Sequence, residues 1–285
     1  QMLTDGSLEG ALTASGLTWE ALSGSSSGGM DAAAWEAVIP SMGYMALLRN
    51  LRNFDEAKIS TNARRRVAEF LENPENVEKS RQLPFRFFSA YRAAPSDYWK
   101  PVLNNALQHA LRNIPQLDGD TEYLIDSSGS MTWGNMSERG TMTYADAAAL
   151  FAVSFAVANG AKRVWGFDSQ AHEFPLLRGA DAMPEVHRFR KALGQGGATY
   201  TATSVQQILA RRASEGLGAP KRLIIVSDEQ IGESASRGWG GNDQPALPEV
   251  VPAETMLYTF NIGGYAVGHA PSGMPNRHTF AGLND

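Results

Sequence analysis

Apolar residues recur at helical spacing through the first half of the chain, and prolines divide them into separate segments. The first pattern begins at Trp35 and continues beyond Pro40 to Phe54, with a break expected at the proline. Four further helices are expected, with prolines near their ends, at residues 64–71, 76–81, 85–91 and 99–111. Helix, turn and helix in succession are typical of HEAT-like helical hairpins, so this half is predicted to be an all-α module.

From residue 121 onward, short apolar runs alternate with helical patterns. Such alternation predicts a doubly wound, mostly parallel, Rossmann-like sheet. Nearly all-apolar strands, such as residues 223–226, predict helices on both faces of that sheet. Strands are expected at residues 121–125, 163–167, 222–226 and 255–261, and helices at 144–159, 181–193 and 203–214. We therefore predict a multidomain α + α/β chain, with the helical module in residues 1–115 and the α/β domain in residues 116–285.

The residues before Trp35 differ in composition from the rest of the helical module. Short helix-like pieces at 8–12 and 19–22 are followed by a Gly/Ser-rich stretch at 23–29. Because glycine and serine bury little apolar surface, this stretch is predicted to be a flexible connection.

Composition narrows the possible functions. The chain of 285 residues has no cysteine, which excludes disulfides, thiolate zinc sites and cysteine nucleophiles and permits a reducing compartment. The longest apolar run, Ala147 to Ala158, is shorter than the roughly 20 residues that cross a bilayer. We therefore expect a cytoplasmic protein with no membrane partner.

The net charge of −5 hides an asymmetry between the two halves. Residues 49–112 hold 12 Lys and Arg against 7 Asp and Glu, and the remainder holds 13 against 23. Clustered arginines bind phosphates through paired hydrogen bonds, which makes the helical module a candidate RNA-binding surface. The alternative is a solvated helix face on which the cations pair with acids such as Glu69 and Glu75. Charge alone does not decide between them.

A set of side-chain oxygens follows the predicted strands of the α/β domain. Asp126 directly follows an apolar run, and Ser128 and Ser130 come at alternate positions after it. Asp228 follows a second apolar strand, and Thr199 comes after a Gly-rich turn. Since the carboxyl ends of parallel strands line one crevice, these side chains are expected to gather there.

The chemistry of this set favours a hard divalent cation. Carboxylates and hydroxyls suit Mg²⁺, Ca²⁺ or Mn²⁺ and are poor zinc ligands. We predict a Mg²⁺ site, with Ca²⁺ or Mn²⁺ as alternatives, and with Thr201 as an alternative to Thr199. The candidate ligands are Asp126, Ser128, Ser130, Thr199 and Asp228.

The three segments together resemble a known site. Asp126-Ser127-Ser128-Gly129-Ser130, Gly196-Gly197-Ala198-Thr199 and Val226-Ser227-Asp228-Glu229 resemble the metal-ion-dependent adhesion site of von Willebrand factor A domains. The resemblance implies that fold for residues 116–285. Because five side-chain oxygens at most bind the ion, it is expected to keep a vacancy or waters, which a partner carboxylate or phosphate could fill.

A second resemblance lies in the helical module. The segments Trp35-Glu36-Ala37, Ala46 to Leu51, and Lys79-Ser80-Arg81 followed by Pro84-Phe85 are similar to the TROVE module of the Ro autoantigen family. Leu83 stands where that family usually has a His. The resemblance implies a ring of helical repeats that binds small non-coding RNAs, including Y RNAs. The candidate RNA-binding residues are Arg49, Arg52, Arg64, Arg65, Arg66, Lys79, Arg81 and Arg86.

These observations favour a non-enzymatic RNA-binding protein that acts in RNA quality control or as a ribonucleoprotein scaffold. One alternative is a protein-adhesion module that recruits an acidic partner through the metal and has no RNA role. A second is a metal-dependent phosphohydrolase, for which no His, Lys or third carboxylate stands out as the general base. The sequence does not predict the oligomeric state.

Overall fold

The computed structural model of the chain describes residues 30–94, 96–112, 114–133, 142–193, 196–229, 246–263 and 273–281. It divides into two compact units between Asn113 and Ile114, two residues before the boundary predicted from the sequence. The predicted helix-like pieces at 8–12 and 19–22 and the Gly/Ser stretch at 23–29 lie outside the described residues. No helix among the described residues is long and apolar enough to cross a membrane.

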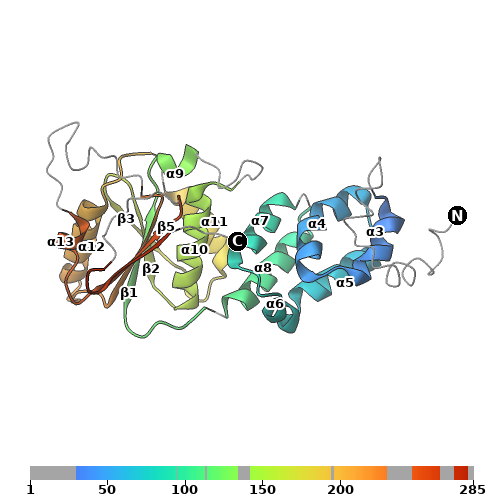
Figure 1. Cartoon of the computed structure of the whole chain (residues 1–285), viewed down its shortest axis with the longest axis horizontal. Coiled ribbons are helices and arrows are strands. Elements are labelled where there is room, and N and C mark those ends of the chain that lie inside the picture. The colour runs from blue at the N-terminus through green and yellow to red at the C-terminus, as the bar shows by residue number, and fades with distance from the viewer. Residues whose placement is uncertain are drawn as a thin grey trace. The chain divides into compact units, whose positions relative to one another are not determined.

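The first unit is helical, and its local sequence explains where the helices begin. Asp31, Ser60 and Asn73 cap three helices by accepting backbone N–H bonds in the first turn, which satisfies donors that the helix leaves free. Pro74 and Pro84 occupy first helical positions, where a missing N–H costs nothing. The elements are α3 (Ala32–Val38), the 3-10 helix η1 (Ile39–Ser41), α4 (Tyr44–Ala57), α5 (Thr61–Glu72), α6 (Pro74–Ser80), α7 (Pro84–Ala93) and α8 (Trp99–Leu111) (Figure 1).

Two helices organise the core of this unit. Both α4 and α8 pack against α5, α6 and α7, so helices distant in sequence share one apolar interior. Trp99, Phe54 and Phe87 are completely buried in it, and the Trp99 indole donates to Asp55 at 3.1 Å. The predicted all-α character is therefore confirmed, and the HEAT-like arrangement stays a prediction.

The second unit is built on a six-stranded sheet in the order β3-β2-β1-β4-β5-β6. Every neighbouring pair is parallel except β2 and β3. Central β1 pairs Leu124 with Trp165 on one side and with Ile225 on the other. The strands are β1 (Thr121–Asp126), β2 (Arg163–Phe167), β3 (Ala171–Pro175), β4 (Arg222–Ser227), β5 (Met256–Asn261) and β6 (Arg277–Ala281).

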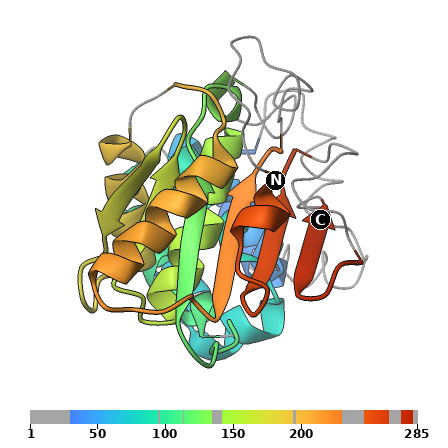
Figure 2. The same ribbon diagram turned by 90° about the vertical axis from the view of Figure 1, so that its left-hand side faces the viewer.

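Helices cover both faces of this sheet, as Figures 1 and 2 show: α10 and α11 lie on one face, α12 and α13 on the other. The helices are α9 (Ser130–Trp133), α10 (Tyr144–Ala158), α11 (Ala182–Ala192), α12 (Thr201–Ser214) and α13 (Leu247–Val250). A capping box formed by Thr143 and Asp146 begins α10. The predicted mostly parallel sheet is confirmed. The sequence-based pattern missed the two edge strands, β3 and β6, because they are largely exposed and lack an apolar run.

Candidate functional site

The candidate metal ligands lie at the carboxyl edge of the sheet. The chain leaves β1 toward β2 and leaves β4 toward β5, which are on opposite sides of the β1–β4 pair. In such sheets the crevice between oppositely directed connections is the usual ligand site. Helix α9 begins in the loop that follows β1 and marks this edge in Figure 1.

Asp126 is the centre of the first loop. Its carboxylate is buried, with 1% of the residue exposed, and Oδ1 accepts the backbone N–H of Ser128 at 2.8 Å. The Ser128 and Ser130 hydroxyls lie 3.3 Å apart. The turn therefore brings the first three candidate ligands together, as their alternate spacing predicted.

Ser227 connects the second loop to the first. Its hydroxyl donates to Asp126 Oδ2 at 2.5 Å and accepts the backbone N–H of Glu229 at 2.9 Å. Asp228, which lies between these two residues, is also 1% exposed. This bridge holds the end of β4 against the end of β1, so the two aspartates face the same region.

The charge of Asp228 adds to the effect of burial on Asp126. Burial raises the pKa of Asp126 to about 6, and the charge of Asp228 acts in the same direction, against lowering by the hydrogen bonds from Ser128 and Ser227. Two buried acids of like charge destabilise each other's ionised form. A divalent cation between them would relieve this repulsion.

The glycine-rich loop that carries Thr199 is held at the same edge. Its Tyr200 N–H donates to Asp168 O at 2.8 Å, and Ala198 N–H donates to Ser169 Oγ at 3.1 Å. Gly197 has φ +121°, and a Cβ there would lie 3.0 Å from Asp168 Cβ. Only glycine combines this backbone conformation with so close an approach.

Thr199 and its alternative Thr201 differ in environment. Thr199 is half-buried, whereas Thr201 is 6% exposed and begins α12. The Thr201 hydroxyl is buried without a hydrogen-bond partner among the described residues. Contacts or charge coupling join Asp126, Ser128, Ser130 and Asp228. Thr199 lies on a loop that is held to the residues after β2 at the same edge of the sheet.

Sequence reasoning missed two residues of this site. Ser227 forms the bridge described above. The sequence signal that could have revealed it is a hydroxyl at the end of an apolar strand, one residue before an acid. Glu229 is 3% exposed and has φ +54°, an uncommon conformation for a residue other than glycine. It is a third buried carboxylate beside the candidate ligands, where the sequence indicated two.

The donor set suits a hard cation bound with incomplete protein coordination. Among the described residues, no group of three or more His, Asp or Glu side chains is arranged to hold a metal ion. The candidate site instead combines two aspartates with hydroxyls. Such a set leaves coordination positions for water or a partner's oxygen.

In the helical unit, several candidate RNA-binding cations are already paired. Arg52 contacts Glu56 at 2.7 Å, Arg65 contacts Glu69 at 3.9 Å, and Lys79 contacts Glu75 at 3.4 Å, all on exposed surfaces. Exposed pairs of this kind are weak and break easily. They match the alternative of a solvated, paired helix face.

Two of the candidate arginines are partly enclosed. Arg64 contacts Asp55 at 3.4 Å, and its guanidinium lies 5.3 Å from the centre of the Tyr98 ring. Arg86 is half-buried and lies 4.9 Å from the Phe85 ring. The three successive arginines 64–66 therefore do not form one surface, because adjacent helical positions point about 100° apart.

Three candidates remain open to a ligand. Within the part of the chain that the structure describes, Arg49, Arg66 and Arg81 are exposed and form no ion pair. Arg81 ends α6 in the left-handed conformation with φ +52°. Leu83, which stands where a His was expected, is 52% exposed just before α7.

Comparison with known proteins identifies the helical unit. Residues 14–126 match the family model of the TROVE domain. The chain carries a TROVE domain. The resemblance drawn from the sequence is thus confirmed, and the TROVE match extends beyond the helices through β1 to Asp126. A search of curated proteins by sequence returns no match.

The fold is similar to a solved Ro structure. The RO (RSR) protein of Deinococcus radiodurans aligns with a TM-score of 0.65 and 16% identity, over 100% of this chain and 58% of that protein. This chain therefore spans less than two thirds of that relative's length. Proximal thread matrix protein 1 of the mussel byssus aligns with a TM-score of 0.35 and 16% identity, over 59% of this chain and 44% of that one, which is too low to support a conclusion.

Proposed function

We propose that this chain binds small non-coding RNA through its TROVE-containing helical unit and acts without catalysis, in RNA quality control or as a ribonucleoprotein scaffold. The observation that carries the proposal is the TROVE match over residues 14–126. The charge of residues 49–112 supports it, since their 12 Lys and Arg against 7 Asp and Glu attract phosphates. Y RNAs are the RNA class that the family resemblance suggests.

The exposed, unpaired arginines are the best candidates for phosphate contacts. An arginine already paired with a glutamate loses that pair when it binds RNA, whereas Arg49, Arg66 and Arg81 lose none of the described ion pairs. Each phosphate contact with a single strand contributes about 0.7 to the slope of log affinity against log salt. Arg52, Arg65 and Lys79 are expected to contribute less.

A paired set of variants tests this proposal. Arg66→Gln with Arg81→Gln should weaken binding of a small single-stranded RNA and lower the salt slope by about 1.4. Arg178→Gln with Lys191→Gln, at exposed positions of the α/β unit, changes the net charge equally and should leave both unchanged. The measurement is an RNA shift assay across a salt titration. Equal losses in both variants would show a net-charge effect, and no loss in either would refute the assignment.

The carboxyl edge of the sheet supports a second function, divalent-dependent docking of an acidic protein partner. We propose a von Willebrand factor A domain in residues 116–285 that holds Mg²⁺ through Asp126, Ser128, Ser130, Thr199 and Asp228, with Ca²⁺ or Mn²⁺ as alternatives. The observation that favours it is the bridge through Ser227, which presents two buried aspartates to one region. A partner carboxylate could occupy a position left free on the cation.

Docking and catalysis predict different results at this site. For docking, a divalent cation should be required for capture of an acidic peptide, and Asp126→Asn should abolish capture without affecting RNA binding. For a phosphohydrolase, p-nitrophenyl phosphate should be hydrolysed in Mg²⁺ and not after chelation. Turnover that is lost in Asp126→Asn would overturn the non-enzymatic assignment.

A further inference from the structure

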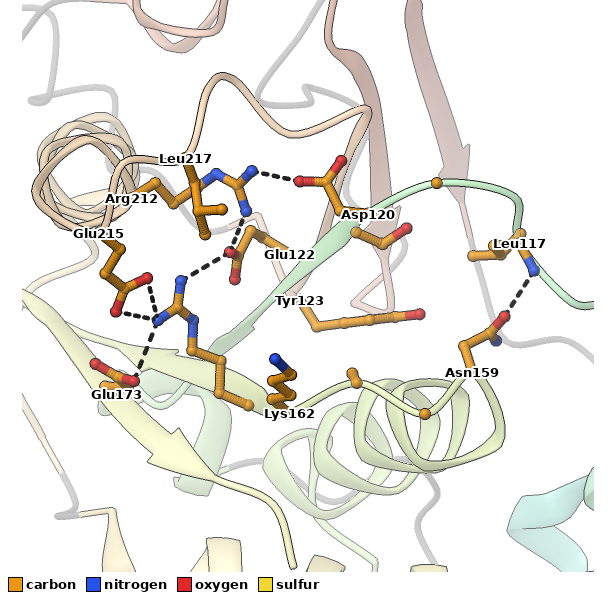
Figure 3. A pocket seen from close by; sticks show the side chains of 15 residues that line it. Leu117, Asp120, Glu122, Tyr123, Asn159, Lys162, Glu173, Arg212, Glu215 and Leu217 are labelled. Carbon is orange, nitrogen blue, oxygen red and sulfur yellow. Dashed lines mark hydrogen bonds and ion pairs between the residues drawn. The ribbon is translucent and has the colours of Figure 1, made fainter. Parts of the chain in front are cut away.

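A cavity lies at the amino-terminal edge of the sheet, opposite the candidate metal site. It has a volume of about 570 Å³, within the range of roughly 300–1,000 Å³ usual for small-molecule sites. The beginnings of β1 and β2, the end of α12 and the turn after α10 contribute its walls (Figure 3). No residue of the candidate metal site lines it.

The acidic side chains in the cavity are already engaged by arginines. Glu122 accepts from Arg212 at 2.7 Å, from Arg163 at 3.1 Å and from the Trp165 indole at 2.7 Å. Figure 3 shows the same arginines paired with Glu215 and Asp120. The acceptors of this network therefore need no further donor.

Three further polar groups of the residues that line the cavity have no partner among the described residues: two hydroxyls and one ammonium group. Tyr123 is completely buried, and its hydroxyl and that of Thr121 have no hydrogen-bond partner among the described residues. The ammonium group of Lys162 likewise forms no ion pair in the described part of the chain. In Figure 3, Lys162 and Tyr123 lie between the arginine network and Asn159.

The Tyr123 hydroxyl keeps its proton at neutral pH. Burial raises the pKa of Tyr123 to about 12, against a lowering effect of the nearby charge of Arg222. A buried hydroxyl without a partner destabilises the fold, so an acceptor that reaches it gains a hydrogen bond in addition to its attraction to Lys162. Four carboxylates and three cations line the cavity, and Lys162 is the cation among these described residues that forms no ion pair. A ligand that satisfies Lys162 and the two hydroxyls has acceptor oxygens and a negative charge.

We propose that the cavity binds a small organic oxyanion, whose phosphate or carboxylate oxygens accept hydrogen bonds from Tyr123 and Thr121 and pair with Lys162. The organic part would lie against Leu117 and Leu217, which also line the cavity. The proposal is independent of RNA and of the metal, since neither set of candidate residues contributes to this cavity.

The test is titration of the full chain in a divalent-free buffer with chelator, which prevents anions from binding through a metal at Asp126. The probes are inorganic phosphate, glycerol 3-phosphate and succinate. Their binding is measured by calorimetry and by the chemical shifts of amides near Tyr123. Saturable binding of the phosphates alone would identify the source as a phosphate ester. Saturable binding of succinate alone would identify it as a carboxylate.

Two variants and one control decide where binding occurs. Tyr123→Phe removes only the hydroxyl and should weaken binding at least about tenfold, which corresponds to about 1.4 kcal/mol. It should leave the melting temperature unchanged or higher, because an unsatisfied buried group is removed. Lys162→Ala should weaken binding similarly, and Lys191→Ala, at another exposed lysine of this unit, should not. No saturable binding of any probe, or equal affinity in Tyr123→Phe and the unsubstituted protein, would overturn the proposal.

Discussion

If the proposed Mg²⁺ site exists, replacing Asp126 by Asn should abolish stabilisation by Mg²⁺ while leaving the metal-free chain folded. Asp126 and Asp228 are each 1% exposed, so a cation between them would offset charges that water hardly reaches. Asn has nearly the shape of Asp and retains one acceptor oxygen for Ser128 N–H or Ser227 O–H, which now donate at 2.8 and 2.5 Å. The loss of one hydrogen bond is partly offset by removal of a buried charge.

The magnitude follows from mass action. A cation that binds only the folded state stabilises it by about 2.7 kcal/mol at a concentration 100 times its Kd. For a unit the size of residues 114–285, each kcal/mol raises the melting temperature by about 2–4 °C. We therefore expect Mg²⁺ to raise the melting temperature of the unsubstituted protein by about 5–10 °C relative to chelator.

The assay is thermal unfolding followed by circular dichroism, with Mg²⁺ and with chelator. Glu254→Gln, which removes an exposed charge of the same unit, is the matched control and should keep the full shift. In Asp126→Asn the shift should fall below about 1 °C. An equal shift in Asp126→Asn and the control, or no shift in the unsubstituted protein, would refute a cation site built on Asp126.

Three further substitutions test the packing around these sites by urea unfolding. Gly197→Ala introduces a Cβ 3.0 Å from Asp168 Cβ, at a residue with φ +121°. It should lower the free energy of unfolding by about 1–3 kcal/mol and reduce the rise in melting temperature caused by Mg²⁺. The control Gly218→Ala, which has open space around it, should be nearly neutral. Arg212→Met removes one of the two arginines that pair with buried Glu122 and leaves Arg163 at 3.1 Å, so it should cost about 1–3 kcal/mol. A comparable cost for exposed Arg211→Met would contradict this reasoning. Arg64→Ala should lower the free energy of unfolding by about 1–2 kcal/mol, because it loses the contacts with Asp55 and Tyr98. Arg66→Ala should change the free energy of unfolding by no more than about 0.5 kcal/mol. Equal costs would show that the enclosure of Arg64 contributes nothing.

The sequence was sufficient to predict those elements and contacts that depend on residues close together in the chain. Caps, prolines and apolar periodicity predicted the helix 99–111 and the strand 163–167 with the bounds observed. The spacing of Asp126, Ser128 and Ser130 predicted their proximity for the same reason, because a turn of five residues closes on itself. The TROVE resemblance likewise depended on short segments that remain recognisable without their partners.

Tertiary structure decided whatever depends on pairing between distant segments. The edge strands β3 and β6 form because they pair with β2 and β5 through backbone hydrogen bonds. No apolar run in the sequence predicts them. Ser227 became part of the candidate site because β4 pairs beside β1, and Arg64 differs from Arg66 because only one of them faces a neighbouring helix. The cavity around Tyr123 joins residues up to 100 positions apart. The burial of a side chain and the identity of its partners depend on which surfaces pack together, so only the tertiary structure determines them.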